Sequence, residues 1–313
     1  IIDTWNEGKV VDIEGYYENA KINRVYVDRV HVKKAFAEYT AAYNADDPKI
    51  KLKIDHTYRV AALCERIAKA AGMCAYDVEL AWLSGMLHDV GRFEQIKRYN
   101  TFSDADSVDH AKFGADLLFK DGLISTFLKG MVKCTGYKPG ALEDRYDSDG
   151  VFLYDRLNKS DMEMLELAIR CHNMYRIPQG LNCREQAFCN VLRDADKVDI
   201  FKVNIDTPLE EIYNTTTEEL MKSDITDEVL EAFDEEHCIL KAIRRTPADT
   251  VIGHVSLAYE LVYDESVRIT VEQGYLAKLM HFHSDNEETN RKMAMVREKM
   301  DSYVKKRIVE KDA

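Results

Sequence analysis

The feature that constrains this chain most is an apolar run that ends in a histidine and an aspartate. Residues 83–87 continue an apolar helical pattern, and His88 and Asp89 follow it directly. Two ionisable side chains at the end of a buried helix carry a large desolvation cost unless a charged or hydrogen-bonding partner faces them. A bound cation satisfies both groups at once, because histidine and aspartate are common metal ligands. The pair therefore predicts a cation beside it and further metal ligands elsewhere in the chain.

Periodicity predicts that the chain is almost entirely α-helical. Apolar residues recur with a period close to 3.6, and only five prolines and fourteen glycines interrupt the 313 residues. A composition of 46% hydrophobic and 32% charged residues is typical of a folded globular protein. The expected helices cover about residues 32–43, 53–71, 75–90, 108–119, 161–173, 184–203 and 290–308. An irregular polar segment is expected at 98–104, and a loop or insertion at 135–151.

The predicted fold class is all-α, with three segments along the chain. Residues 1–45 form an N-terminal extension that is partly helical, and residues 25–27 within it fit a short edge strand. Residues 46–205 contain the candidate metal ligands, and residues 206–313 form a C-terminal helical region without a recognisable ligand motif. The boundary near residue 206 rests on Pro208 and on the end of the ligand-type pattern.

Net charge and hydropathy argue against several classes of partner. A net charge of −13 disfavours polymeric nucleic acid, whose binding needs many lysine and arginine contacts with phosphates. A small phosphorylated ligand, held by a metal and a few basic side chains, is compatible with that charge. No apolar run approaches the roughly 20 residues of a membrane span, and the first residues lack a secretory signal pattern. The seven cysteines lack CxxC pairing, which indicates reduced thiols, and we expect a cytoplasmic protein.

Three further histidines lie on apolar helix faces. His56 is followed by apolar residues at helical spacing, His110 by a similar set, and His172 is preceded by one. A single histidine on such a face is usually a hydrogen-bonded core residue. Three of them on separate helices, together with His88 and Asp89, accumulate a large desolvation cost unless they share a partner. Imidazole and carboxylate groups around one cation remove that cost.

A carboxylate that completes the set is expected near residue 195. Asp194 and Asp196 each have apolar residues at helical spacing on their own face, so periodicity does not choose between them. An aspartate-rich turn that stands alone is usually a solvated helix face. Both aspartates therefore remain candidates on the pattern alone.

The order His56, His88-Asp89 and Asp196 resembles the signature of the HD-domain superfamily of metal-dependent phosphohydrolases, over roughly residues 50–205. This resemblance implies a helical bundle in which these four residues bind a divalent metal ion. The implied cofactor is one or two ions for each chain, with Mn, Fe, Co, Ni, Mg and Zn as the candidate metals.

The resemblance also implies a choice between the two aspartates. The segment 196–199, Asp-Lys-Val-Asp, matches the last motif of the family better than a motif that opens at Asp194. Asp196 is therefore the expected ligand. Asp194 is expected to contact the metal ligands without binding the metal itself.

His110 and His172 match two positions of one branch of that superfamily, the dinuclear cyclic-dinucleotide phosphodiesterases. The second of those segments has two adjacent histidines in that branch, whereas Asn173 follows His172 here. The Gly-Tyr-Pro loop of the branch is missing, and Leu52 stands where it has a glutamate, so a cyclic dinucleotide is not the predicted substrate. His110 and His172 either bind a second metal, or act as proton donor and phosphate contacts beside a single one.

The implied reaction is hydrolysis of a small phosphate ester or nucleotide, with metal-activated water as the nucleophile. The catalytic residues expected from the resemblance are Asp89, His110, His172, Arg92 and Lys197. Arg92 and Lys197, with Arg59 as a further candidate, neutralise the charge that develops on the phosphoryl oxygens.

Two other functions are compatible with the same ligand set. One is a di-iron oxygenase built on this fold, and the other is a non-catalytic module that senses a nucleotide. The C-terminal region 206–313 is expected either to cover the site and set substrate choice, or to support a homodimer.

Overall fold

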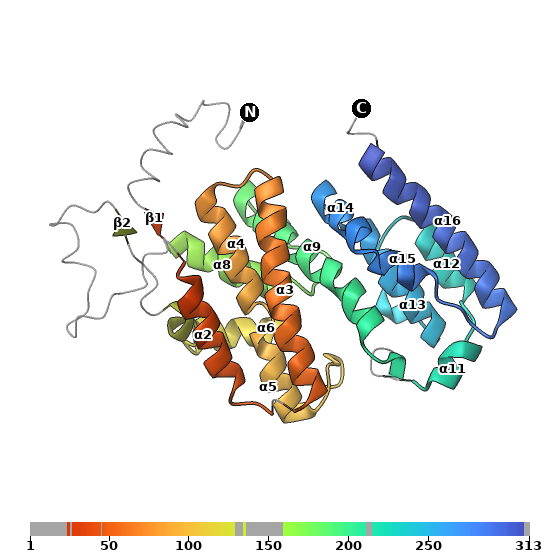
Figure 1. Cartoon of the computed structure of the whole chain (residues 1–313), viewed down its shortest axis with the longest axis horizontal. Coiled ribbons are helices and arrows are strands. Elements are labelled where there is room, and N and C mark those ends of the chain that lie inside the picture. Colours follow the sequence, from red (N-terminus) through yellow and green to blue (C-terminus); the bar gives the residue numbers. More distant parts are fainter. Residues whose placement is uncertain are drawn as a thin grey trace. The chain divides into compact units, whose positions relative to one another are not determined.

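The computed structural model describes residues 24–25, 27–44, 46–128, 134–135, 159–210 and 215–309 of the chain. Most of these residues are helical, which confirms the predicted all-α fold (Figure 1). The strands among them are β1 (Arg24–Val25) and β2 (Cys134–Thr135), which form a short antiparallel pair. The strand predicted at 25–27 thus begins one residue earlier, and Tyr26 lies outside the described residues.

The chain divides into two compact units, Ile1–Leu192 and Arg193–Ala313. Helix α9 (Cys183–Asp206) is continuous through this division. The domain boundary predicted near residue 206 falls at the end of the same helix and stays a prediction. The loop or insertion predicted at 135–151 lies outside the described residues, except for Thr135.

The first unit is built from helices close to those predicted. Besides the first part of α9 they are α2 (Arg29–Thr40), α3 (Pro48–Ala70), α4 (Ala75–Leu87), α5 (Val90–Tyr99), α6 (His110–Ala115), the short π-helix η1 (Asp116–Lys120), α7 (Ile124–Leu128) and α8 (Lys159–Cys171). Helix α3 begins at residue 48 rather than 53, because Pro48 suits the first helical position and Asp47 accepts a hydrogen bond from the N–H of Lys49.

The single helix predicted over 75–90 is wrong, because this stretch belongs to two helices. Helix α4 ends at Leu87, and α5 begins at Val90 and continues to Tyr99. Asp89 separates them with φ −106° and ψ 14°, in the bridge region between helical and extended backbone. Apolar residues continue across this break, so the periodicity of the sequence does not reveal it.

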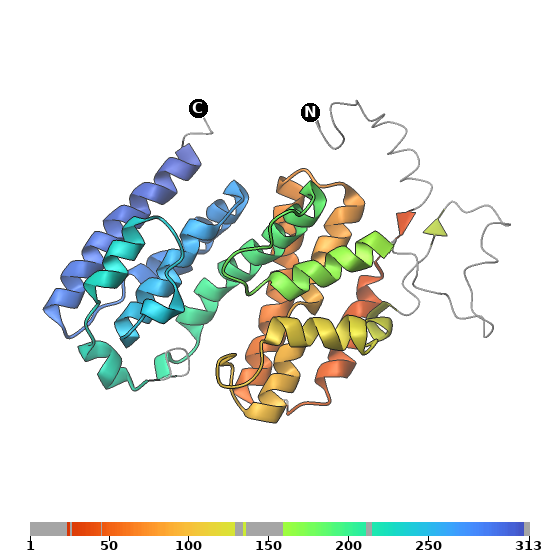
Figure 2. The same cartoon turned by 180° about the vertical axis from the view of Figure 1, so that it is seen from behind.

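Two close contacts between helices position the ligand-type residues. A Cβ atom on Gly85 of α4 would lie 2.6 Å from Cα of Ala61, so α3 and α4 approach this closely only with a glycine there. A Cβ atom on Gly91 of α5 would lie 2.4 Å from the carbonyl oxygen of His110 and 2.7 Å from the nitrogen of Gly114. The first contact joins α3 to α4, which run side by side in both views, and the second joins α5 to α6 (Figures 1 and 2).

The second unit contains the end of α9 and a further set of helices around its own core. These are α11 (Thr217–Lys222), α12 (Asp227–Asp234), η3 (Lys241–Ile243), α13 (Pro247–Val255), η4 (Ser256–Glu260), α14 (Asp264–Gln273), α15 (Tyr275–Met280) and α16 (Glu287–Val309). Phe201, Phe233, Ile252 and Met300 are among the side chains buried in this core. The predicted C-terminal helical region is confirmed, and α16 is the helix predicted at 290–308.

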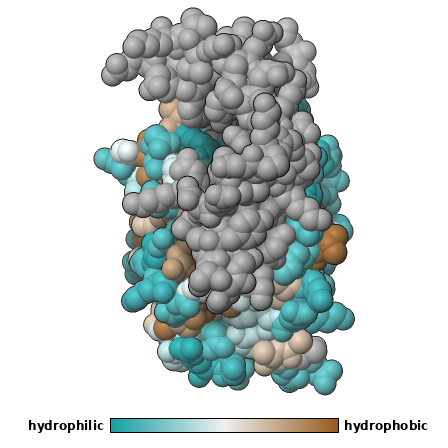
Figure 3. Space-filling model, turned by 90° about the vertical axis from the view of Figure 1, so that its left-hand side faces the viewer, coloured by the Kyte–Doolittle hydropathy of each residue, from teal (hydrophilic) through white to brown (hydrophobic). Residues whose placement is uncertain are grey.

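Amphipathic helices that pack their apolar faces into a core expose their polar faces to solvent. On the face that Figure 3 shows, the described residues are mainly hydrophilic, with scattered hydrophobic side chains between them. None of the helices in the described part of the chain combines the length and the apolar character that crossing a membrane requires.

Candidate metal centre

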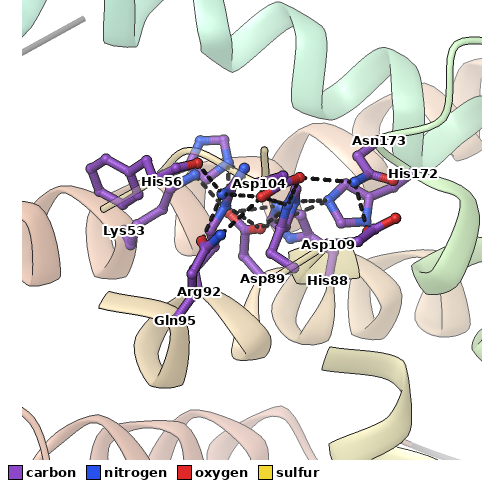
Figure 4. A network of polar contacts seen from close by, with 12 residues as sticks. Lys53, His56, His88, Asp89, Arg92, Gln95, Asp104, Asp109, His172 and Asn173 are labelled. Atoms are coloured by element: carbon purple, nitrogen blue, oxygen red, sulfur yellow. Dashed lines mark hydrogen bonds and ion pairs between the residues drawn. The ribbon is translucent and has the colours of Figure 1, made fainter. Parts of the chain in front are cut away.

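Asp89 lies at the centre of the ligand-type residues, and each of its carboxylate oxygens faces a different pair of histidines (Figure 4). Oδ2 is 3.5 Å from Nε2 of His56 and 3.5 Å from Nε2 of His88. Oδ1 is 3.5 Å from Nε2 of His110 and 3.7 Å from Nε2 of His172. We call the first set position 1 and the second set position 2, and Asp89 belongs to both.

The five side chains converge because each stands at a defined point of a helix. His56 lies on the buried face of α3, His88 follows the last residue of α4, and Asp89 separates α4 from α5. His110 is the first residue of α6, and His172 follows the last residue of α8. All five are at most 5% exposed. The structure thus brings together five residues that were predicted to bind metal, and their role as ligands stays a prediction.

Hydrogen bonds determine which ring nitrogen carries the proton in three of these histidines. Nδ1 of His88 and Nδ1 of His172 each donate to a backbone carbonyl oxygen one turn earlier, at 2.8 and 2.7 Å. Nδ1 of His110 donates to the carboxylate of Asp104 at 2.7 Å. In a neutral ring, a proton on Nδ1 leaves a lone pair on Nε2. All three rings therefore present a potential ligand atom toward Asp89.

This arrangement of acceptor atoms fits bound cations. Nε2 of His110 and Nε2 of His172 are 3.0 Å apart, and those of His56 and His88 are 3.3 Å apart. Oδ1 of Asp89 is buried and accepts no hydrogen bond within the described part of the chain, which is rare for a carboxylate oxygen. Nitrogen and oxygen ligands of one divalent ion lie about 3.0–3.5 Å from one another. The residues present therefore fit a cation at each position.

Electrostatics favour the protonation states that metal binding needs. Burial raises the pKa of the Asp89 carboxyl, but the charge of Lys53 and the contacts with His88 and His110 outweigh it and hold this pKa well below its usual range. Burial and the charge of Arg92 lower the pKa of His110. At neutral pH Asp89 is therefore a carboxylate and His110 a neutral imidazole, which are the forms that bind metal.

Comparison with known protein families agrees with this geometry. The profile of the family described as HD domain matches residues 54–202. Residues 54–202 form an HD domain. This confirms the resemblance inferred from the sequence, and HD domains are typically metal-dependent hydrolases. No curated protein and no solved structure matches the chain. The HD domain extends from α3 into α9 and includes both positions around Asp89.

Lys53 and Asp104 contact Asp89 and His110, respectively, and neither is among the site residues predicted from the sequence. Nζ of Lys53 donates to Oδ2 of Asp89 at 2.7 Å. Lys53 lies one turn before His56 on α3, and this helical spacing was an available signal. Asp104 lies in the irregular segment before α6, where periodicity carries no information. It is identified by the hydrogen bond that it accepts from His110.

Asn173 directly follows His172 after the end of α8. Its side-chain amide donates to Asp109 at 2.9 Å and to Asp104 at 3.2 Å. Asn173 therefore helps to hold the segment that orients His110.

We expect Asp104→Asn to weaken metal binding at position 2. The substitution removes the negative charge that holds the proton on Nδ1 of His110, so this ring is less firmly oriented. Such supporting partners of metal-binding histidines contribute about 10- to 100-fold to metal affinity. Equilibrium dialysis with elemental analysis measures the loss. Asp106→Asn, an exposed change in the same segment, serves as the control, and equal metal affinity in the two variants would argue against an orienting role.

Arg92 lies beside the ligands and is anchored by the segment that precedes α6. Its Nε is 3.8 Å from Oδ1 of Asp89. One terminal nitrogen donates to the carbonyl oxygen of Phe102 and to the carboxylate of Asp104. Arg59 is partly buried on α3. A contact of either arginine with a substrate phosphate stays a prediction.

The two candidate aspartates of α9 lie on different faces of that helix. Asp194 accepts hydrogen bonds from the backbone N–H groups of Val262 and Tyr263 and from the hydroxyl of Ser266, so its carboxylate is engaged within the second unit. Asp196 lies two residues further along the helix. Its assignment as a ligand of position 1, and the supporting role expected of Asp194, stay predictions.

Lys197 is a buried amine near the start of the second unit. It is 8% exposed, and burial with the charge of Arg193 lowers its pKa from 10.5 to about 8, against the attraction of Asp194, Asp196 and Glu260. Its predicted contact with a substrate phosphate stays a prediction.

We expect Lys197 to make the free energy of unfolding rise with pH between about 8 and 10.5. In this range the amine is deprotonated in the folded chain and protonated in the unfolded chain, so stability rises by at most about 1.4 kcal/mol per pH unit. Below pH 8 both states hold the proton, and this contribution is constant. Urea unfolding of wild type and Lys197→Met at several pH values measures it. The free energy of unfolding of wild type minus that of Lys197→Met should increase with pH. A value that stays constant with pH would contradict the lowered pKa.

Proposed function

We propose that this HD domain is a metal-dependent phosphohydrolase that acts on a small phosphate ester or a nucleotide. The observation that supports this most is the arrangement around Asp89, whose two carboxylate oxygens each face a pair of histidine nitrogens at 3.5 to 3.7 Å. A divalent cation held there supplies activated water at neutral pH and positive charge beside the phosphoryl oxygens.

The side chains of the domain meet the other needs of this reaction. The buried histidines and Asp89 form a preorganised ligand set, because hydrogen bonds and helix packing already hold them in place. Lys53 and Arg92 bring positive charge to the same carboxylate, at 2.7 and 3.8 Å. Fixed charges of this kind stabilise the negative charge that develops on phosphoryl oxygens in the transition state.

A second candidate is a di-iron oxygenase on the same fold. The shared carboxylate supports this candidate, because two positions joined by Asp89 suit two iron ions as well as two ions of a hydrolase. A third candidate, a non-catalytic module that senses a nucleotide, predicts binding without product formation. Family membership favours hydrolysis over both.

Metal content and turnover, measured on the same samples, test the proposal. The chelated protein is reloaded with Mn²⁺, Co²⁺, Ni²⁺ or Fe²⁺, and its bound metal is determined by elemental mass spectrometry. Phosphate release is then measured with p-nitrophenyl phosphate and a panel of nucleotides. We expect stoichiometric metal and phosphate release that chelation abolishes and metal restores. Protein that holds no stoichiometric metal and releases no phosphate would refute the proposal.

Variants separate the candidates. His88→Ala should lose position 1 and His110→Ala should lose position 2, whereas the exposed His281→Ala should behave as wild type. Oxygen consumption by iron-loaded protein, without phosphate release, would favour the oxygenase. Nucleotide binding without a product would favour the sensing module.

We also propose that the protein works in the cytoplasm. Among the described residues, Cys74, Cys183 and Cys238 are free thiols, as is usual in a reducing compartment. The expected partner is the small phosphorylated substrate, and the C-terminal helices are proposed to set substrate choice or to support a homodimer.

A further inference from the structure

Lys53 occupies a place where a metal ion and an amine compete for one oxygen. Its Nζ is 2.7 Å from Oδ2 of Asp89, the oxygen that belongs to position 1. Histidine nitrogens of the same position lie 3.5 Å from that oxygen. An ammonium group and a divalent cation on a single carboxylate oxygen repel each other strongly in a buried site, where screening is weak. The contact between Lys53 and Asp89 therefore opposes metal binding at position 1.

Lys53 also differs from the ligands in its exposure to solvent. Its side chain is 17% exposed and that of Arg92 is 14% exposed, whereas the side chain of Asp89 is 2% exposed. Nζ of Lys53 lies 5.7 Å from the centre of the Phe102 ring, and the guanidinium carbon of Arg92 lies 5.9 Å from the same centre. Two positive side chains thus lie near one partly exposed aromatic ring, and both are more exposed than the carboxylate of Asp89. These two positive side chains are therefore accessible charges beside Asp89 that would attract an anion.

We propose that Lys53 exchanges partners when the centre is loaded. In the metal-free protein it neutralises Asp89, and in the loaded protein it turns from Asp89 and donates its hydrogen bonds to an oxygen of the substrate phosphoryl group. Lys53 is thus a specificity-determining residue for anionic phosphate. This inference rests on the proposed function for its substrate class.

The exchange predicts two effects of opposite sign in one variant. Lys53→Met removes the charge that competes with metal, so Mn²⁺ should bind about tenfold more tightly to the chelated protein. The same change removes a phosphate contact, so inorganic phosphate should bind about tenfold more weakly to the Mn²⁺-loaded protein. A lysine that only holds Asp89 in place would have a different signature, because its loss would weaken Mn²⁺ binding.

Calorimetric titration of Mn²⁺, and then of inorganic phosphate, measures both constants without any need for turnover. Lys53→Arg keeps the charge and should remain close to wild type in both titrations. Lys51→Met, an exposed change on the same helix, is the matched control and should also behave as wild type. A comparison of His110→Ala with and without Lys53→Met assigns the change in Mn²⁺ affinity to position 1. If Lys53→Met does not fold by circular dichroism, Lys53→Gln takes its place, since it is also neutral.

The outcomes separate this inference from the proposed function. Mn²⁺ affinity that stays equal or falls in the neutral variants overturns the exchange, and so does unchanged phosphate affinity. If Lys53→Met shows both effects but wild type hydrolyses no ester, the inference stands and the phosphohydrolase proposal fails. If wild type hydrolyses esters and Lys53→Met alters neither binding constant, the phosphohydrolase proposal stands and the inference about Lys53 fails.

Discussion

Asp89→Asn is expected to abolish metal binding at both positions and, with it, the hydrolytic activity. Both carboxylate oxygens of Asp89 face histidine nitrogens at 3.5 to 3.7 Å, so one residue serves both positions. Asparagine keeps the shape but has no negative charge, and its amide nitrogen donates hydrogen bonds and does not bind metal. The substitution thus removes a ligand atom from one position and the negative charge from both.

The pattern of loss across variants makes this prediction specific. Bound ions per chain, measured by elemental mass spectrometry, should fall to background in Asp89→Asn. In contrast, His56→Ala should lose position 1 and His172→Ala should lose position 2. Asp55→Asn, an exposed change beside His56 on α3, is the matched control and should keep all bound metal. Stoichiometric metal in a folded Asp89→Asn protein would show that Asp89 is not a shared ligand.

Among substitutions that add one methyl group near the candidate metal centre, Gly91→Ala is expected to destabilise the fold most. Its Cβ atom would lie 2.4 Å from the carbonyl oxygen of His110, 2.7 Å from the nitrogen of Gly114 and 2.9 Å from Cα of Gly114. All three atoms belong to the backbone, so relief requires α5 and α6 to separate rather than a side chain to rotate. We expect the free energy of unfolding to fall by roughly 3 kcal/mol, the upper range for overpacking.

The facing glycine provides a graded comparison. A Cβ atom on Gly114 would lie 3.0 Å from the nitrogen of Gly91 and 3.4 Å from its Cα, so Gly114→Ala needs a smaller shift. In urea unfolding with a chelator present, the free energy of unfolding should therefore be highest for wild type, lower for Gly114→Ala and lowest for Gly91→Ala. Separation of α5 from α6 also moves His110, so Gly91→Ala should lose metal at position 2 before position 1. Wild-type stability in Gly91→Ala would show that the two helices do not need this close contact.

The ligand-type residues of the first unit could be recognised from the sequence because they lie on periodic helices. His56, His110 and His172 stand on apolar faces, and His88-Asp89 ends an apolar run, so a pattern of burial was visible without the structure. The all-α fold follows from the same periodicity. These inferences depend only on neighbours within about two turns of a helix.

Features that depend on distant contacts could not be predicted in the same way. Asp104 precedes α6 in an irregular segment, and only the folded chain shows that its carboxylate accepts a hydrogen bond from Nδ1–H of His110. The donors that bond to Asp194, namely Val262, Tyr263 and Ser266, lie far along the sequence. The break at Asp89 between α4 and α5 escapes a periodicity argument because apolar residues continue on both sides of it.

His88, Asp89 and His172 also stand at helix ends whose polarity suits the proposed metal centre. His88 and His172 follow the last residues of α4 and α8, and their Nδ1 atoms donate to the carbonyl oxygens of Gly85 and Ile169 in the final turns. The carboxyl end of a helix carries a partial negative charge, which favours a cation nearby. Asp89 instead precedes the amino end of α5, whose partial positive charge favours a carboxylate. The helix dipoles therefore favour a cation beside the neutral rings of His88 and His172, and they stabilise the negative charge of Asp89. Both effects are built into the backbone and do not depend on a bound ion.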